Sequence, residues 1–208
     1  MRLQALTLYL LAAAGLATPI RSAASEELYT LRLSSADKSL DGRYLTTIPD
    51  SGNANTTALV VYTSASKPGD AFIKFHPVIN PSTKLAELRT PSSSSNVALA
   101  VVGTNGLFDF ASVADPDDTA DDLPEGTTVD WTSFRLHQEE DIGTVEYEGD
   151  DDAVAKGNWF AFPIRVSEAT KEGEAWGVKW KDGSAWTTTD YLPVKVVYEP
   201  VYVTAKDE

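Results

Sequence analysis

Apolar and polar residues alternate along short runs through most of the chain. Tyr29, Leu31 and Leu33, for example, are separated by polar residues, and Asn105-Gly106 and Asp182-Gly183 are turn signals of the kind found between strands. Period-two alternation places successive side chains on opposite faces of a half-buried β-strand. The signal recurs often enough to predict about eleven or twelve strands. We expect them at 29–34, 44–48, 59–63, 71–76, 85–89, 97–102, 108–110, 132–137, 144–148, 159–164, 176–181 and 194–198.

Helical periodicity is weak after the first residues of the chain. Ser82–Leu88 and Ser167–Gly173 could each form about one helical turn. Many short strands with almost no helix predict an all-β fold: a single-domain antiparallel sandwich or closed barrel. A β-trefoil is the alternative because it also uses about twelve strands. It ranks second because a threefold repeat of about 45 to 55 residues is visible only as loose echoes.

The N-terminal residues have the three parts of a secretory signal peptide. Arg2 is followed by the apolar run Leu3–Leu16 and then by small residues. We therefore expect a signal peptide at 1–24, cleaved somewhere in 17–24, and a secreted all-β domain at 25–208. The apolar run is too short to span a bilayer comfortably, so we expect an extracellular protein without a membrane anchor.

The composition narrows the chemistry available to such a protein. The 208 residues include no cysteine, 17 Lys and Arg, and 31 Asp and Glu, for a formal net charge of −14. Without cysteine there is no thiol catalysis and no disulfide, so extracellular stability has to come from core burial. The negative charge disfavours nucleic acid and anionic lipid as partners.

Catalytic and metal-binding patterns are sparse. His76 and His137 are the two histidines and are far apart in sequence, so zinc is disfavoured, and no Gly-x-Ser-x-Gly motif is present. Glycosidases hold two carboxyl groups about 5 Å or 6.5–9.5 Å apart. Asp109, Glu146 and Glu148 are the first candidates for such a pair, although solvated charges on a polar face are the more ordinary interpretation. We predict no catalytic residue.

An acidic stretch at Ala114–Gly126 could hold calcium weakly. It lacks the glycine and glutamate that an EF-hand loop needs, and we expect a solvated loop there. We therefore predict no metal site and no cofactor.

The tryptophans provide the strongest functional signal because sugar rings stack on exposed aromatic faces. Trp176 and Trp180 are four residues apart in one predicted strand, so they share a face and are expected in the core. Trp159 alternates with Phe160 along its strand, and Trp186 lies in a polar stretch. We therefore expect Trp159 and Trp186 to bind glycan.

Asn55 begins the Asn55-Thr56-Thr57 sequon, which lies in a Gly/Asn/Thr-rich turn. In a secreted protein this position is a candidate for N-glycosylation.

The order of strands and aromatic positions resembles the phialide-associated (PhiA-like) family of small secreted fungal cell-wall proteins and their elicitor-like relatives. Members of that family carry cysteines in the C-terminal part, and this chain carries none. The segments that carry the resemblance are Leu28-Tyr29-Thr30-Leu31, Gly103-Thr104-Asn105-Gly106-Leu107, Trp131–Leu136, Gly143–Tyr147, Trp159–Pro163 and Trp176–Trp180.

The resemblance implies a non-enzymatic secreted or cell-wall-associated protein, such as an effector or elicitor, with a cell-wall glycan or a host surface protein as its partner. The residues themselves leave two alternatives: a carbohydrate-binding, lectin-like module, or an enzyme that acts on glycans through paired carboxylates. An exposed aromatic row would favour the first alternative, and a cleft with two close carboxylates would favour the second.

Overall fold

The computed structural model describes residues 27–48, 55–63, 72–91, 96–139, 142–149, 156–165 and 174–201, and the predicted signal peptide lies outside them. The elements in chain order are β1 (Tyr29–Ser35), β2 (Thr46–Thr47), β3 (Thr56–Tyr62), β4 (Lys74–Ile79), β5 (Ala86–Arg89), β6 (Val97–Thr104), β7 (Leu107–Ala114), α1 (Pro116–Asp122), β8 (Thr128–Asp130), β9 (Phe134–Glu139), β10 (Ile142–Tyr147), β11 (Asn158–Ile164), β12 (Ala175–Lys181) and β13 (Leu192–Pro200).

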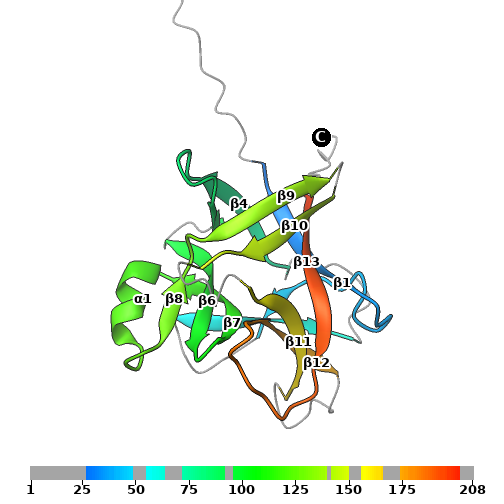
Figure 1. Cartoon of the computed structure of the whole chain (residues 1–208). Coiled ribbons are helices and arrows are strands. Elements are labelled where there is room, and N and C mark those ends of the chain that lie inside the picture. Colours follow the sequence, from blue (N-terminus) through cyan, green and yellow to red (C-terminus); the bar gives the residue numbers. More distant parts are fainter. Residues whose placement is uncertain are drawn as a thin grey trace, which may run out of the picture.

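In the described part of the chain, 13 strands join in one antiparallel sheet, which confirms the all-β prediction. Six of these strands form a closed ring in the order β1, β4, β5, β9, β10 and β13, because β13 pairs again with β1. Three hairpins, β2–β3, β6–β7 and β11–β12, extend from the ring, and β3, β7 and β12 pair with one another. Figure 1 shows β9 and β10 in the upper half, the hairpins β6–β7 and β11–β12 below, and β13 running from the upper part into the lower half. This connectivity is that of a β-trefoil, the alternative that the sequence left open.

The ring consists of three strand pairs, β1 with β4, β5 with β9, and β10 with β13. The second strand of each pair carries a buried aromatic side chain. Phe75 on β4, Phe134 on β9 and Tyr198 on β13 are all buried and pair with Tyr29, Ala86 and Gly143, respectively. A Cβ atom at Gly143 would lie 2.0 Å from the Tyr198 ring, so this position has to be glycine. The three pairs occupy corresponding positions in the ring, and each fills its position with a different combination of large and small residues.

The acidic stretch that was expected to be a loop contains α1 and precedes β8. Pro116 stands at the start of the helix, and Asp117 and Asp118 occupy its first turn, where carboxylates interact favourably with the helix dipole. The Thr119 side chain is buried, and its hydroxyl donates to the Ala114 carbonyl oxygen at 2.5 Å. The solvated-loop prediction was therefore wrong for these residues.

Neither of the two segments considered for a helical turn is shown to form one. Residues 82–88 form a turn that leads into β5, and residues 167–173 lie outside the described part of the chain. Within that part, no helix has the length and apolar character that crossing a membrane requires.

Candidate functional site

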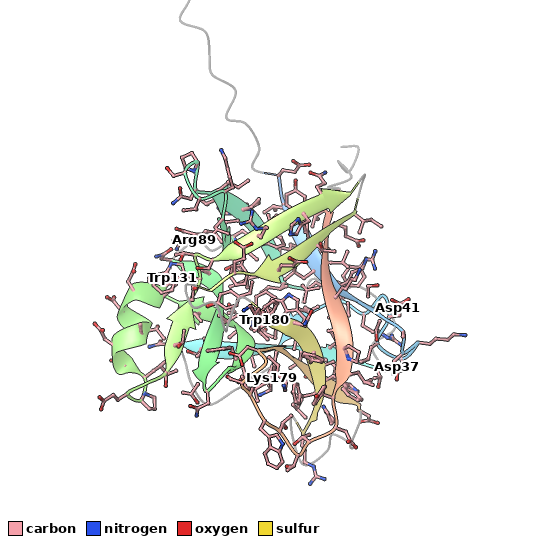
Figure 2. All side chains as sticks on the ribbon, in the orientation of Figure 1. Asp37, Asp41, Arg89, Trp131, Lys179 and Trp180 are labelled. Carbon is pink, nitrogen blue, oxygen red and sulfur yellow. The ribbon has the colours of Figure 1, made fainter. Side chains whose placement is uncertain are left out.

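The outer surface of the β11–β12 hairpin combines aromatic and basic side chains. Trp159 and Trp180 point into the core, so alternation along the strands places Phe160 and Lys179, which are paired with each other, on the opposite surface. Phe162, Lys181 and Tyr191 complete this surface, which we name the aromatic face. It lies at the lower end of the molecule, where Figure 2 labels Lys179.

Tyr191 comes from the loop between β12 and β13 and packs against the two phenylalanines. Its ring centroid lies 4.9 Å from that of Phe160 and 5.3 Å from that of Phe162. The Nζ atoms of Lys179 and Lys181 lie 5.8 Å from the Phe162 ring and 5.9 Å from the Tyr191 ring, respectively, within cation–π range. These contacts fix the aromatic side chains in place before any ligand arrives.

The same loop presents Trp186 to solvent. Its side chain is 85% exposed, and that of Tyr191 is 39% exposed. The exposure of Trp186 predicted from its polar surroundings is therefore confirmed. A large exposed aromatic residue on a structured loop is a typical element of a binding surface.

A buried carboxylate at Asp182 anchors this loop. Asp182 is 2% exposed, and its Oδ1 atom accepts hydrogen bonds from the backbone N–H of Ser184 (2.8 Å), the Ser184 hydroxyl (2.6 Å) and the backbone N–H of Ala185 (3.1 Å). Its own backbone N–H donates to the Gly106 carbonyl oxygen at 2.9 Å. Gly106 has a φ of +73°, and a Cβ atom there would lie 2.1 Å from Asp182 Oδ1. The tight Asn105-Gly106 turn thus leaves room for the carboxylate that holds the Trp186 loop.

The local contacts determine the charge state of Asp182. Burial alone would raise the pKa of this carboxyl group. The hydrogen bonds from Ser184 and Ala185 and the positive charge of Lys181 act in the opposite direction, and together they hold the pKa below its ordinary value of 3.8. The anchor is therefore ionised at neutral pH.

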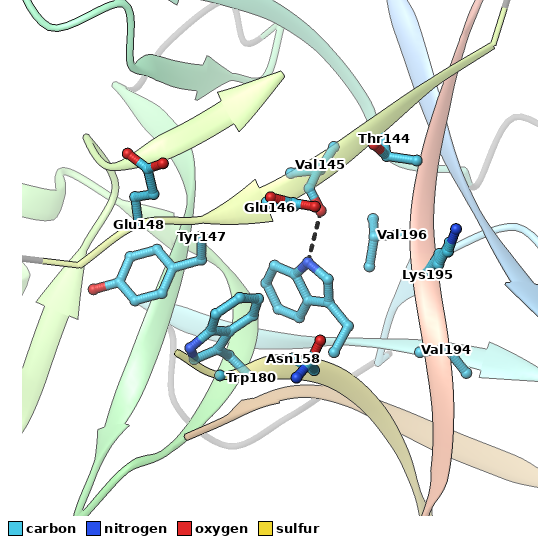
Figure 3. A pocket seen from close by; sticks show the side chains of 12 residues that line it. Thr144, Val145, Glu146, Tyr147, Glu148, Asn158, Trp180, Val194, Lys195 and Val196 are labelled. Atoms are coloured by element: carbon cyan, nitrogen blue, oxygen red, sulfur yellow. Dashed lines mark hydrogen bonds between the residues drawn. The ribbon is translucent and has the colours of Figure 1, made fainter. Parts of the chain in front are cut away.

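A groove with two lobes lies beside the aromatic face, between β10, β11, β13 and the end of β1. The first lobe has a volume of about 260 Å³ and is lined by Glu146, Glu148 and Trp180, among other residues. The second has a volume of about 480 Å³ and is lined by Ser34, Ser35, Ala36, Phe160 and Pro193, among others. Figure 3 shows the first lobe from close by.

The lobes are continuous because Asn158, Trp159, Val194 and Lys195 line both of them. Phe160 belongs to the second lobe and also contacts Tyr191, so the groove adjoins the aromatic face.

Trp159 lies in the core and not on the surface. It is 3% exposed, its ring packs against Phe110 at 4.9 Å and Trp180 at 5.1 Å, and its Nε1–H donates to the Val145 carbonyl oxygen at 2.7 Å. The ring therefore has no free face for stacking a sugar, although part of it borders the groove. Of the two predicted glycan-binding tryptophans, the structure leaves Trp186 with the geometry for that role.

Each of the three candidate carboxylates has a basic side chain as its partner. Asp109 pairs with Lys179 at 2.8 Å and Glu146 with His137 at 3.2 Å. Glu148 receives two hydrogen bonds of 2.5 Å from the Arg135 guanidinium, and these lower the pKa of the Glu148 carboxyl group. A general acid in a glycosidase needs a raised pKa, and Glu148 has the opposite perturbation.

The other predicted positions are dispersed over the fold. Asn55 is exposed in the turn that precedes β3, on a surface where a glycan would have room. Within the described residues, no three His, Asp or Glu side chains are placed to hold a metal ion.

Sequence reasoning missed Phe160, Lys195, Asp182 and Tyr191 as site residues. The inward direction of Trp159 would have placed Phe160 on the outer surface, and Asp182-Gly183 was interpreted simply as a turn. The groove has no local sequence signal, because it forms where β10 and β11 separate along β13.

Comparisons with known proteins give no assignment. No family model matches the chain, and neither a curated protein nor a solved structure matches it significantly. The likeness to PhiA-like cell-wall proteins therefore stays a prediction.

Proposed function

We propose that this chain is a secreted, non-enzymatic carbohydrate-binding protein whose ligand stacks on Trp186 and Tyr191. The observation that carries the proposal is the 85% exposure of Trp186 on a loop that a buried carboxylate anchors. Indole and phenol rings offer an apolar face to the C–H groups of a sugar while tolerating water around it. A loop that is already ordered loses little conformational entropy when the sugar binds.

The proposal is consistent with the secretion and the cell-wall glycan partner that the sequence led us to expect. An N-terminal secretion signal and a strong negative charge suit a protein released outside the cell, where a cell-wall glycan is an accessible partner. The contacts of Asp109, Glu146 and Glu148 with basic side chains give these carboxylates an ordinary structural role. An effector or elicitor role would follow from such binding and stays a prediction.

Titration with soluble β-glucan, xylan and chitin oligomers tests the proposal, with intrinsic fluorescence and calorimetry as readouts. We expect Trp186→Ala to weaken binding by about fivefold to tenfold and Trp186→Phe to weaken it less, because a stacking ring remains. Trp131→Phe is the control, since Trp131 is half-buried beside α1, away from the aromatic face (Figure 2).

The same samples are assayed for new reducing ends. Release of sugar would contradict the non-enzymatic part of the proposal. Full affinity in Trp186→Ala, or no binding to any glycan, would contradict the binding part.

A further inference from the structure

The second lobe of the groove combines an apolar floor with a polar, positively charged rim. Phe160 and Pro193, which are paired across β11 and β13, form the floor, and Ser34, Asn158 and Lys195 supply hydroxyl, amide and ammonium groups around it. A sugar ring has the complementary form: apolar C–H groups on its faces and hydroxyl groups around its edge.

Lys195 is the cation of this lobe. It is exposed, and among the described residues no carboxylate lies within ion-pair distance of its Nζ atom. No acidic side chain lines the second lobe. Of the described residues, Lys195 is the one cationic side chain that lines the second lobe, in a chain with 31 acidic and 17 basic residues, and its ammonium group attracts a negatively charged group.

The first lobe directs such a ligand away from itself. Glu146 and Glu148 line that lobe, so an anion would meet two carboxylates there, although the Arg135 guanidinium offsets the charge of Glu148. The two lobes therefore differ in electrostatic character, and an anionic sugar is favoured in the second.

We infer that the second lobe binds a hexuronate, a sugar ring that carries one carboxylate, with the carboxylate at Lys195 Nζ and the ring over Phe160 and Pro193. One ammonium group matches one carboxylate, whereas a phosphate or sulfate ester would be better served by several cations or by a bidentate guanidinium. Because Phe160 also contacts Tyr191, neighbouring sugars of the same chain can continue onto the aromatic face. The inference rests on the proposed function and specifies the class of glycan.

Calorimetric titration of the full chain with oligogalacturonate, with its methyl ester and with a neutral β-glucan oligomer tests the inference. We expect oligogalacturonate to bind best. We expect Lys195→Gln to weaken that binding at least about fivefold, because it removes a charged hydrogen-bond donor. Lys195→Arg should retain most of the affinity, and the methyl ester should be insensitive to Lys195→Gln.

Lys84→Gln is the matched control. It removes the same charge from the β4–β5 turn, which lines neither lobe, so any effect of net charge alone will appear in both variants. Equal effects of Lys84→Gln and Lys195→Gln would overturn the assignment to Lys195. Binding of the neutral oligomer in preference to the uronate would overturn the inference and leave the proposed function standing. Absence of binding to all three oligomers would overturn the inference, and the proposed function falls with it when xylan and chitin oligomers also fail to bind.

Discussion

Replacing Asp182 with alanine is the sharpest test of how the Trp186 loop is held. The substitution removes an acceptor that takes hydrogen bonds from the Ser184 N–H, the Ser184 hydroxyl and the Ala185 N–H. Water can replace the lost acceptor at exposed Ser184, but Ala185 is 8% exposed, so its N–H is left without a partner. A lost buried hydrogen bond of this kind costs about 1–3 kcal/mol. We expect a total loss of about 2–3 kcal/mol in the free energy of unfolding.

A loss of that size is measurable by thermal unfolding. For a chain of 150–250 residues, each kcal/mol corresponds to roughly 2–4 °C, so Tm should fall by roughly 4–12 °C. Glycan binding should weaken as well, because Trp186 follows directly after the residues that the carboxylate holds. Both effects should be seen in the same sample.

Asp37 provides a matched control for this substitution. Its Oδ1 atom accepts hydrogen bonds from the Ser39 N–H at 2.8 Å and the Ser39 hydroxyl at 2.7 Å, the same arrangement that Asp182 makes with Ser184. The Asp37 turn faces solvent, where water can replace the lost acceptor. Asp37→Ala should therefore leave Tm nearly unchanged. Equal losses in the two variants would refute the argument that burial makes the Asp182 contacts important.

The dependence on pH provides a second check on the same group. The hydrogen bonds hold the pKa of Asp182 in the folded state below 3.8, its ordinary value and thus the value expected in the unfolded chain. Its contribution to stability is therefore fully present above pH 3.8 and is lost as pH falls through the folded-state pKa. The Tm difference between the natural chain and Asp182→Asn should be constant near neutral pH and shrink below that value. A difference that grows as pH falls would refute the assignment.

Two further substitutions test the packing of the core. Gly143→Ala should lower the free energy of unfolding by about 2–3 kcal/mol, because the new Cβ would overlap the Tyr198 ring, whereas Gly183→Ala should have little effect, since no atom lies within 4 Å of its Cβ position. Trp159→Phe should cost about 2 kcal/mol in denaturant titrations, because it leaves the Val145 carbonyl without its indole donor and removes part of a packed ring. Similar stabilities for the two glycine variants, or a stable Trp159→Phe chain, would contradict these contacts.

Much of the fold could be predicted from alternation alone. The predicted ranges each overlap an observed strand or, at 44–48, contain the short β2. The missed strand β8 has three residues, too few for alternation to be visible. The helix α1 was missed because its exposed aspartates give no apolar stripe, and its stability comes from one buried threonine and a proline at its start.

The threefold plan is visible only as loose echoes in the sequence, for a physical reason. Corresponding positions in the ring are filled by Tyr29, Ala86 and Gly143, each opposite a buried aromatic residue. Packing constrains the combined volume of each pair and not the identity of either member, so the repeat is conserved in shape and is hidden in sequence. Strand pairing, which depends on contacts between distant residues, was needed to reveal it.

Sequence reasoning could predict which side chains of the candidate site are exposed where the neighbouring residues are polar. It could not predict the features that depend on how distant strands pair. Trp186 lies in a polar stretch, and this context indicated its exposure. For Trp159 the alternation gave two faces without indicating which one is inward, and the core contacts with Phe110 and Trp180 settle the direction. Lys195 lines the groove because β10 and β11 separate along β13, and no local sequence pattern indicates that separation.

The second and third hairpins differ in what covers their outer surfaces, and this difference bears on where the proposed binding surface lies. On β6–β7 the outer surface, which includes Val102 and Val113, is covered by Leu123, Val129 and Trp131 from the α1–β8 excursion. On β11–β12 the β12–β13 loop covers the outer surface with Tyr191, which packs on Phe160 and Phe162, and leaves Trp186 exposed.

Trp131 and Trp186 should therefore respond in opposite ways to truncation. Trp131→Ala uncovers the apolar outer surface of β6–β7, so it should lower the free energy of unfolding by about 2 kcal/mol and leave glycan affinity unchanged. Trp186→Ala removes a side chain that is 85% exposed, so it should leave Tm nearly unchanged and weaken glycan binding. Thermal unfolding and calorimetric titration of both variants separate the two roles. A loss of affinity in Trp131→Ala, or a marked fall in Tm in Trp186→Ala, would show that the two surfaces are not divided between stability and binding.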